Sequence, residues 1–384
     1  MQLDPLDEHP IHQVPLSMAY VATADRNAYD RCIFQGVEHD GGTVFLTGLG
    51  VYPNLGIVDA FMSVRRGDRQ WSLQASGVRP DDKLRQEVGP YRIEVVEPFR
   101  RIRIVGEADD IAAEDGPDDG SGGLGFDLWF ESDYEPQREP QHVKYGGPAN
   151  GVLLEGCRYA QVGTWRGELR VGGETIAVAP ERWTATRDRS WGIRPVGEPP
   201  PPGRPARREP ALWYLWAPIR FEDFGVHFMI EEDPDGFRTL NYAVRFWPSA
   251  TGRKVEQLGW PEVDVRYRSG TRLPEAVTLR TRTVDRKPLD IELELAPGIP
   301  LHLGPGYGTG DRGWSHGRWM GERWARLLTY DHTDPEVQAK LPWAPIDHVA
   351  RATCEGQTGH GIFEHATIGR HAPTGMADLS AVAP

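Results

Sequence analysis

Short segments in which apolar and polar residues alternate run through most of this 384-residue chain. Such a period of two is typical of β-strands with one buried face. Many of the segments end in turn-forming pairs such as Asp-Gly or Ser-Gly, and long windows with helical periodicity are rare. The pattern predicts an all-β fold of antiparallel strands that close into barrels or sandwiches. The clearest segments are 43–46, 91–96, 101–105, 126–130, 276–281 and 291–295.

A six-residue pattern, G-x-W-x-G-E, occurs twice, at residues 163–168 and 317–322. The two copies lie 154 residues apart (317 minus 163), which is about the length of one compact domain. Each copy is followed by a strand-like segment that carries a lone carboxylate. The repeat therefore predicts a tandem duplication, with one barrel in residues 1–197 and a second in residues 211–384.

Between these expected domains, residues 198–210 contain four consecutive prolines, at 199–202. Proline runs favour a stiff, extended backbone without ladder hydrogen bonds, so this stretch is either the linker or a long loop. A second segment, 109–123, is acidic and rich in glycine. It is expected to be a surface loop or, alternatively, a lid over a cavity.

Charge and hydropathy exclude several classes of function. The net charge of −13 argues against a nucleic-acid partner, because binding to phosphates needs a basic surface. No membrane span is expected, and the N-terminus lacks the basic start and apolar run of a signal peptide, so the expected location is cytoplasmic. The three cysteines are odd in number and far apart, which favours reduced thiols over a disulfide framework.

The order of motifs in the second half resembles that of the carotenoid 1,2-hydratase (hydroxyneurosporene synthase) and AttH-like family, to which fungal Diels–Alderases are related. The resemblance implies two tandem lipocalin-like antiparallel β-barrels and covers about half of the chain. The motifs that carry it are Trp183 to Gly192 with Asp188 and Trp191, a tryptophan-rich hairpin at 213–230, the segment 316–319 and the segment 359–364.

Asp188 is the first candidate for catalysis. On a strand, Thr186, Asp188 and Ser190 share one face, whereas Arg187 and Arg189 share the other. Arginines are the more natural pair to leave in solvent, so we expect Asp188 to point inward. A carboxyl in an apolar interior has a raised pKa and can act as a general acid or base. The alternative is an ionised Asp188 held by a neighbouring arginine.

Two further candidates are Glu364 and His316. Glu364 shares a strand face with His360 and Ile362, so the acid and the imidazole form either a proton relay or a satisfied buried hydrogen bond. His316 ends a glycine-rich segment, 304–317, which fits no phosphate-binding motif. Loops of this kind at the mouth of a barrel often carry function, so Asp311, Trp314 and His316 are expected to reach over the opening.

Seven of the thirteen tryptophans lie in or beside these motifs. Some must fill the barrel cores, but part of the aromatic surface is expected to line a pocket for a flat or polyene-like ligand. Such rings also stabilise a developing carbocation. The residues expected to bind the substrate are Trp191, Tyr214, Trp216, His227, Asp311 and Trp314.

We expect no metal and no cofactor. The twelve histidines are scattered without the spacing of metal ligands, and motifs for covalent catalysis or nucleotide binding are absent. The leading hypothesis is a cofactor-free enzyme that acts on a hydrophobic small molecule (terpenoid, steroid-like, polyketide or aromatic). Its reaction would be a proton transfer in a cavity near the junction of two barrels: hydration, dehydration, isomerisation or cyclisation.

Two other interpretations remain open. A tandem lipocalin that binds a lipid without chemical change would have a pocket whose carboxylates are all paired with arginine. A structural protein built from duplicated β-units would need no cavity. The oligomeric state cannot be read from the residues.

Overall fold

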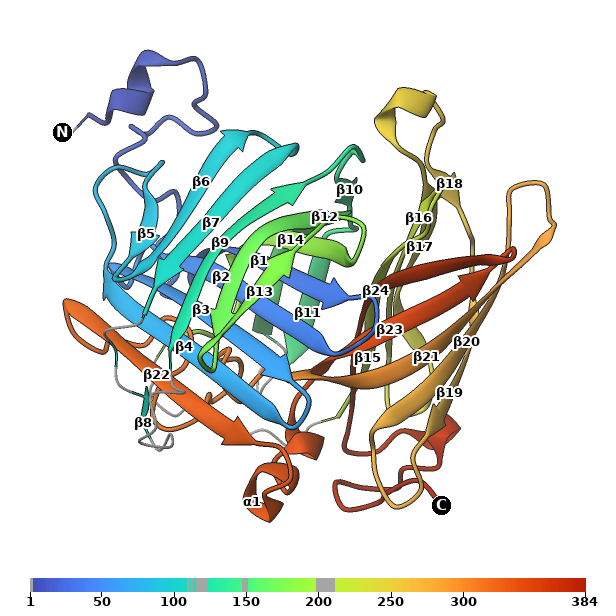
Figure 1. Cartoon of the computed structure of the whole chain (residues 1–384). Coiled ribbons are helices and arrows are strands. Elements are labelled where there is room, and N and C mark those ends of the chain that lie inside the picture. Colours follow the sequence, from blue (N-terminus) through green and yellow to red (C-terminus); the bar gives the residue numbers. More distant parts are fainter. Residues whose placement is uncertain (1–2, 109–110, 112, 115–122, 147–150, 198–210) are drawn as a thin grey trace.

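The computed structural model of the protein describes residues 3–108, 111, 113–114, 123–146, 151–197 and 211–384. Its strands form two sheets that lie side by side, one of fifteen strands and one of nine. In Figure 1 the first sheet is coloured mainly blue to green and the second yellow to red. The first is a nearly closed barrel, because β5 at one end of the sheet returns to contact β3 and β4, and the second is a half-barrel. The predicted all-β fold with two tandem barrels is confirmed.

Within each sheet, neighbouring strands are antiparallel except for a short parallel pair between β8 and β22. The first sheet consists of β1 (Ala28–Glu38), β2 (Thr43–Tyr52), β3 (Ile57–Arg66), β4 (Arg69–Val78), β5 (Gln86–Val88), β6 (Tyr91–Glu97), β7 (Arg101–Glu107), β8 (Ala113–Glu114), β9 (Leu124–Glu131), β10 (Gln137–Arg138), β11 (His142–Gly146), β12 (Gly151–Val171), β13 (Glu174–Val178), β14 (Trp183–Ile193) and β22 (Arg323–Asp331).

The second sheet consists of β15 (Leu212–Arg220), β16 (Gly225–Glu232), β17 (Arg238–Phe246), β18 (Glu256–Gln257), β19 (Glu262–Tyr267), β20 (Pro274–Arg282), β21 (Pro288–Pro300), β23 (Ile346–Cys354) and β24 (Gln357–Ile368). The described helices are all short: η1 (Pro5–Glu8), η2 (Ser249–Thr251), α1 (Pro335–Gln338), η3 (Leu341–Trp343) and η4 (Ala372–Thr374).

Each barrel has its own apolar core, and a third apolar cluster lies between the barrels. Alternation along the strands produces this arrangement, because successive side chains point to opposite faces. On β15, Leu215 packs in the second barrel while its neighbour Trp216 packs between the barrels. We call this third cluster the interface cluster; it comprises Ile33, Val37, Val44, Leu46, Phe61, Ala160, Tyr214, Trp216, Met229, Ile299, Leu301, Trp314, Val349 and Ile362.

The expected division of the chain needs one correction. β22 belongs to the second half of the sequence, but it pairs with β4 along its whole length and so extends the first sheet. Figure 1 shows it as an orange strand beside the blue strands of the first barrel. Its Leu327 is fully buried in the core of the first barrel, and this burial is the reason why β22 pairs with the first sheet. The stretch 198–210, proposed as a linker, and most of the loop 109–123 lie outside the described residues.

The two G-x-W-x-G-E copies do not occupy equivalent positions. The first lies within the central strand β12, where Trp165 is fully buried. The second lies in the connection that leads into β22, and its Trp319 is 50% exposed. The repeated hexapeptide is therefore not the mark of the duplication.

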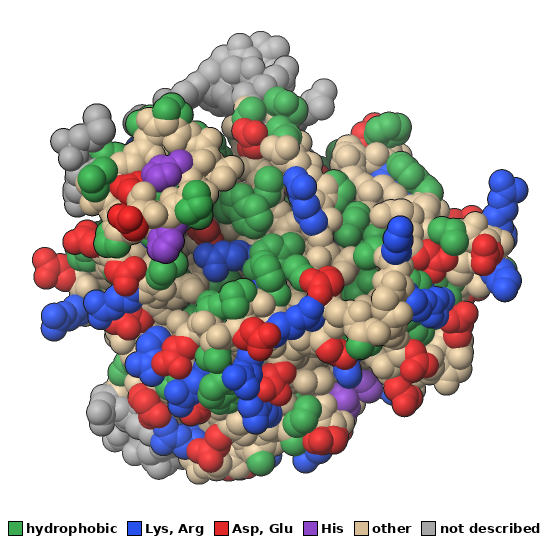
Figure 2. Space-filling view, turned by 90° about the horizontal axis from the view of Figure 1, so that it is seen from above, with side chains coloured by type: hydrophobic (Ala, Val, Ile, Leu, Met, Phe, Trp, Pro, Cys, Tyr) green, Lys and Arg blue, Asp and Glu red, His purple; other side chains and the backbone are tan. Residues whose placement is uncertain are grey.

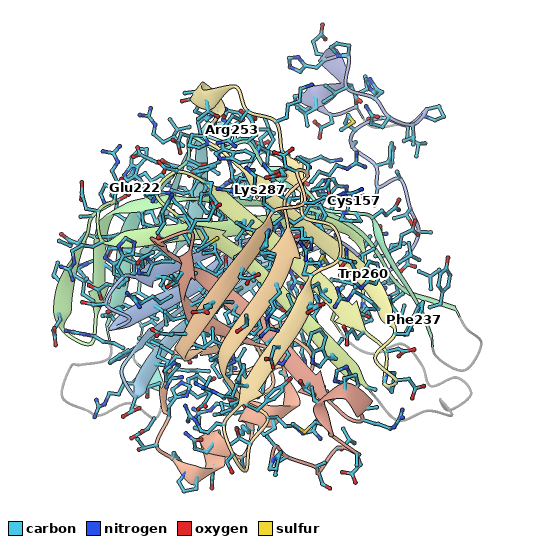
Figure 3. The ribbon with its side chains drawn as sticks, turned by 90° about the vertical axis from the view of Figure 1, so that its right-hand side faces the viewer. Cys157, Glu222, Phe237, Arg253, Trp260 and Lys287 are labelled. Atoms are coloured by element: carbon cyan, nitrogen blue, oxygen red, sulfur yellow. The ribbon has the colours of Figure 1, made fainter. Side chains whose placement is uncertain are left out.

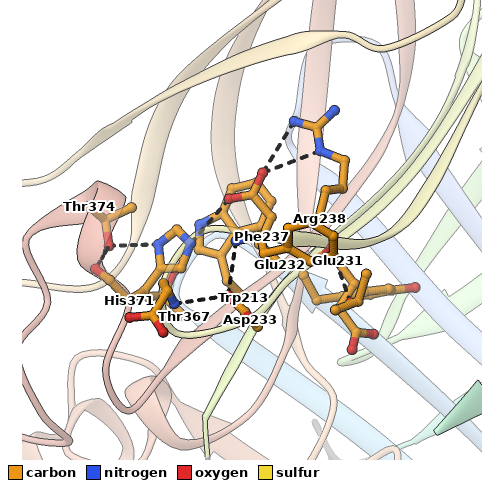
Figure 4. Close-up of polar contacts among 12 residues, drawn as sticks. Trp213, Glu231, Glu232, Asp233, Phe237, Arg238, Thr367, His371 and Thr374 are labelled. Atoms are coloured by element: carbon orange, nitrogen blue, oxygen red, sulfur yellow. Dashed lines mark hydrogen bonds and ion pairs between the residues drawn. The ribbon is translucent and has the colours of Figure 1, made fainter.

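A buried polar network attaches the C-terminal segment to the second barrel (Figure 4). Glu232 on β16 lies between Arg238 and His371, with a distance of 3.2 Å to a nitrogen of each. The His371 ring also stacks on Trp213, with ring centroids 5.2 Å apart. On the outside of the same barrel, Phe237 and Trp260 are exposed (Figure 3).

Candidate functional site

A cavity of about 200 Å³ lies at the junction of the two sheets. Strands β1, β12 and β14 form one wall, and β15, β16, β23 and β24 form the other. The rim includes residues of β11 and of the segment before it. On the face of the molecule seen in Figure 2, hydrophobic side chains gather near the centre among mixed acidic and basic groups. The cavity wall has the same mixed character, with Leu154, Met229 and Leu301 among five carboxylates and four basic side chains.

Asp188 faces this cavity from β14, which lies between β1 and β12. The side chain is 8% exposed, and burial raises its pKa to about 6, against the opposing effect of Arg158. Within the described residues, no hydrogen bond or ion pair joins Asp188 to another side chain. The carboxyl is therefore free to meet a ligand and titrates near neutral pH.

Arg187, on the opposite face of β14 from Asp188, does not lie where it was expected. Arg187 is 4% exposed rather than in solvent, because it points into the interior of the first barrel. Asp188 accordingly points out of that barrel and towards the second sheet. Both faces of β14 are buried, so the assignment of Asp188 to a buried position holds although the arginine argument behind it does not.

Glu364 and Asp347 form a pair of acids on the opposite wall. They are directly opposite each other on β24 and β23, and both line the cavity. Burial raises the pKa of Glu364 to about 7, and burial together with the charge of Glu364 raises the pKa of Asp347 well above its usual range. Gln35 donates a hydrogen bond to Asp347 (Nε2 to Oδ2, 3.3 Å), while Oδ1 of Asp347 is buried without a partner. Burial and the closeness of the second carboxyl thus favour the protonated form of the pair.

The backbone beside Asp347 is set by a glycine. At Gly298, in an irregular part of β21, a Cβ atom would lie 1.7 Å from the carbonyl oxygen of Asp347. Only glycine permits this approach of the two strands. The position of the Asp347 side chain in the wall thus depends on Gly298.

A second set of polar groups surrounds Glu139. Arg158 forms an ion pair with Glu139 and donates to the hydroxyl of Tyr214 (Nη2 to Oη, 3.1 Å). Trp216 donates its indole N–H to Glu139 at 2.8 Å, and His227 lies 3.2 Å from the same oxygen. Burial lowers the pKa of His227 to about 4, so its imidazole is neutral. This network fixes the Arg158 and Tyr214 side chains at the cavity wall.

Tyr307 closes another side of the cavity and comes from the glycine-rich segment. Its ring lies under two guanidinium groups, 5.0 Å from Arg31 and 5.7 Å from Arg194. His316 is behind it, with its ring 4.9 Å from that of Tyr307 and its Nδ1 3.4 Å from Asp59. Burial lowers the pKa of His316 to about 4. His316 thus supports Tyr307 and does not line the cavity.

The other residues proposed from the sequence occupy four kinds of position. Tyr214 lines the cavity, whereas Trp216 and His227 form the layer behind it. Trp314 is buried in the interface cluster. Trp191 and Asp311 lie away from the cavity. Trp191 is 43% exposed at the other face of β14, and Asp311 pairs with Lys340 at 3.0 Å.

His360 was expected beside Glu364 but is not part of this site. Its ring stacks on that of His39, with centroids 4.1 Å apart, and neither histidine lines the cavity. Asp347 takes the expected place of His360 as the partner of Glu364.

Comparison with known proteins places the chain in a family. The model of one protein family matches residues 3–377. The chain belongs to DUF8625, a family of unknown function. No curated protein is significantly similar to the sequence.

One solved structure supports the fold assignment of this DUF8625 protein. The match to an AttH-like protein from Nitrosomonas europaea covers 93% of this chain and 98% of that protein's chain, with 13% identity and a TM-score of 0.52. Kievitone hydratase from Nectria haematococca (88% of both chains, 13% identity, TM-score 0.49) and CghA (89% and 88%, 11% identity, TM-score 0.48) are also similar. The resemblance to the AttH-like group is thus confirmed at the level of the fold.

Four residues that the site uses were missed in the sequence: Glu139, Arg158, Tyr307 and Asp347. Asp347 carries a usable signal, because on a strand it shares a face with the apolar Val349. Glu139 and Arg158 carry none, since charged residues are common at such positions and only the packing of the second sheet buries them.

The described part of the DUF8625 chain shows no group of three or more His, Cys, Asp or Glu side chains placed to hold a metal ion. Among the helices described, none is long and apolar enough to cross a membrane. The three cysteines are free, and Cys157 on β12, labelled in Figure 3, is among the residues that line the cavity.

Proposed function

We propose that this protein is an enzyme that moves protons on a hydrophobic small molecule bound between its two barrels. The observation that carries the proposal is the placement of Asp188 opposite the Asp347–Glu364 pair in one cavity. The pKa values of these acids are raised to different extents, to about 6 for Asp188 and to about 7 for Glu364. Groups with separated pKa values near neutrality are suited to divide the roles of acid and base.

The proposed roles follow from this order. The Asp347–Glu364 pair retains a proton and donates it to an alkene, enol or leaving hydroxyl group. Asp188, the more acidic group, is ionised in most molecules at neutral pH and accepts a proton from water or from a substrate carbon. In a hydration, one proton enters the substrate from the pair, water adds to the resulting cation, and Asp188 accepts the proton that water loses.

The cavity wall favours an uncharged ligand with a large apolar part and one or two oxygen atoms. Leu154, Leu212, Met229 and Leu301 offer apolar surface, while the hydroxyls of Tyr214 and Tyr307 offer hydrogen bonds to an oxygen. A terpenoid, polyketide or aromatic compound fits this description, and the resemblance to carotenoid hydratases points in the same direction.

Binding without chemistry is less well supported. That alternative calls for cavity carboxylates that are all held by arginine, but only Glu139 is paired with arginine among the described residues of the wall.

The test uses Asp188→Asn. The enzyme would be incubated in D₂O with a panel of terpenoid and aromatic alkenes and enols, and products would be detected by mass as added water or incorporated deuterium. We expect Asp188→Asn to lower turnover by about 100-fold or more, the usual contribution of a general acid or base.

The matched control is Asp30→Asn, which removes a carboxylate from the adjacent strand β1, where Asp30 pairs with Arg189 at 2.9 Å and does not line this cavity. It should retain turnover. Full turnover by a folded Asp188→Asn variant, or tryptophan quenching by the panel without any change in mass, would contradict the proposal.

A further inference from the structure

A second pocket, of about 120 Å³, lies inside the first barrel. It is separated from the cavity between the barrels by the strand β14 itself, since Arg187 faces one and Asp188 faces the other. The residues that line it are Cys32, Phe34, Gln86, Ile93, Val95, Pro98, Phe99, Ile102, Tyr159, Arg187 and Arg189.

Arg187 brings a positive charge into this pocket without a carboxylate to balance it. Three aromatic rings surround its guanidinium, those of Phe34, Phe130 and Tyr159, at 5.4, 5.3 and 5.2 Å. Its Nη2 donates to the hydroxyl of Tyr159 at 2.5 Å, and its buried Nε has no partner. Within the described residues, no Asp or Glu lies within ion-pair distance of Arg187.

The neighbouring Arg189, in contrast to Arg187, has a carboxylate partner. Arg189 lines the same pocket but forms an ion pair with Asp30 (Nη2 to Oδ1, 2.9 Å). Burying an arginine without such a partner is costly, because the charge loses its hydration and gains only ring contacts and one hydroxyl in return. An anion in the pocket would remove this cost.

Phe99 lies at the exposed side of the pocket. It has φ of 64°, a conformation that a phenylalanine rarely adopts, and its side chain is 42% exposed. The buried Gln161 side chain holds the turn by donating to the carbonyl of Phe99 at 2.8 Å. The Phe99 ring in turn packs edge-on against Tyr159, with centroids 5.6 Å apart. The ring thus stands between solvent and the partner of Arg187.

We propose that the interior of the first barrel is a binding site for a short-chain monocarboxylate. The carboxylate would accept hydrogen bonds from Arg187 and the hydroxyl of Tyr159, since the planar guanidinium matches a carboxylate in shape and charge. The alkyl chain would contact Phe34, Ile93 and Ile102. A cavity of 150 Å³ accommodates benzene, so the pocket has room for about four to six non-hydrogen atoms.

The test compares butyrate with butyramide, which has nearly the same shape but no charge. Calorimetric titration of the full chain should detect binding of butyrate and none of butyramide. Arg187→Gln should weaken butyrate binding roughly ten- to hundredfold, because it removes a charge-assisted hydrogen bond. Arg266→Gln, which changes an exposed arginine on β19 of the second sheet whose side chain is 72% accessible, should leave the affinity for butyrate unchanged.

Two further measurements keep the result decisive. If Arg187→Gln fails to fold, the thermal midpoint of the wild-type protein should still rise with butyrate and not with butyramide. Phe99→Ala should speed butyrate association. Four results would overturn the proposal. They are equal binding of butyramide, undiminished affinity in a folded Arg187→Gln variant, tighter binding of inorganic phosphate, and no detectable binding at about 10 mM butyrate, a concentration that would reveal a weak ligand.

Discussion

Asp347 and Glu364 lie on adjacent strands and form a pair of carboxyls whose titration differs from that of either residue alone. Side chains directly opposite each other on an antiparallel pair have Cβ atoms about 5 Å apart. Two carboxylates at that separation in a buried wall cannot both ionise readily, so the pair titrates as a unit. Since Asp188 stands across the cavity, its charge adds to the cost of ionising the pair.

This pair makes the stability of the protein depend on pH. The folded protein binds the proton of Glu364 more tightly than the unfolded chain does, because the pKa rises from 4.5 to about 7 on folding. The free energy of unfolding should therefore fall as pH increases from about 4.5 to 7, by a few kcal/mol at most, since one pKa unit corresponds to about 1.4 kcal/mol. Glu364→Gln should flatten this decline in urea unfolding curves measured across the range.

The control for this prediction is Glu294→Gln, which alters an exposed acid on β21 whose side chain is 79% accessible. It should keep the wild-type pH profile. The same decline in both variants would show that other groups cause the pH dependence.

At the scale of elements, strand periodicity explains both what the sequence could predict and what it could not. The alternation of apolar and polar residues is a local property, so strands such as β2, β7 and β20 and the hairpin β15–β16 were predictable. It also placed Asp188 and Arg187 on opposite faces of β14. Which cavity each face meets depends on the second sheet, and the pairing of Asp347 with Glu364 depends on the register of two strands. Neither follows from a single segment.

β22 provides a direct test of how the elements cooperate. Leu327 is fully buried in the core of the first barrel and pairs with Leu73 of β4. Leu327→Ala should lower the free energy of unfolding by about 2–5 kcal/mol, because it leaves a cavity in that core. Arg323→Ala, at the exposed start of the same strand, should change it by less than about 0.5 kcal/mol. Equal effects of the two substitutions in denaturant unfolding would show that β22 does not stabilise the first barrel.

At the scale of the whole molecule, the two barrels share structure in two ways. The interface cluster joins the outer faces of both sheets, and β22 connects the second half of the chain to the first core. The candidate active site lies in this shared region, with Asp188 on one sheet and Glu364 on the other. The relative position of the barrels thus determines the distance between the proposed acid and base.

Because of this sharing, the full chain should unfold in one thermal transition, with equal calorimetric and van't Hoff enthalpies. Ile362→Asp should lower the midpoint of that transition or split it, because it places an unpaired charge in the interface cluster. Val284→Asp, in an exposed turn where the side chain is 68% accessible, should do neither. Two separate transitions in the wild-type protein would mean that the barrels are independent.

The late position of β22 in the sequence also affects how the protein folds during its synthesis. β4 ends at Val78 and its partner begins at Arg323, 245 residues later (323 minus 78). At about 5–20 residues per second, a ribosome needs roughly 10 to 50 s to make that length of chain. During this interval the edge of β4 has no partner strand and can pair with another nascent polypeptide. We therefore expect newly made chains to depend on chaperones until translation is almost complete.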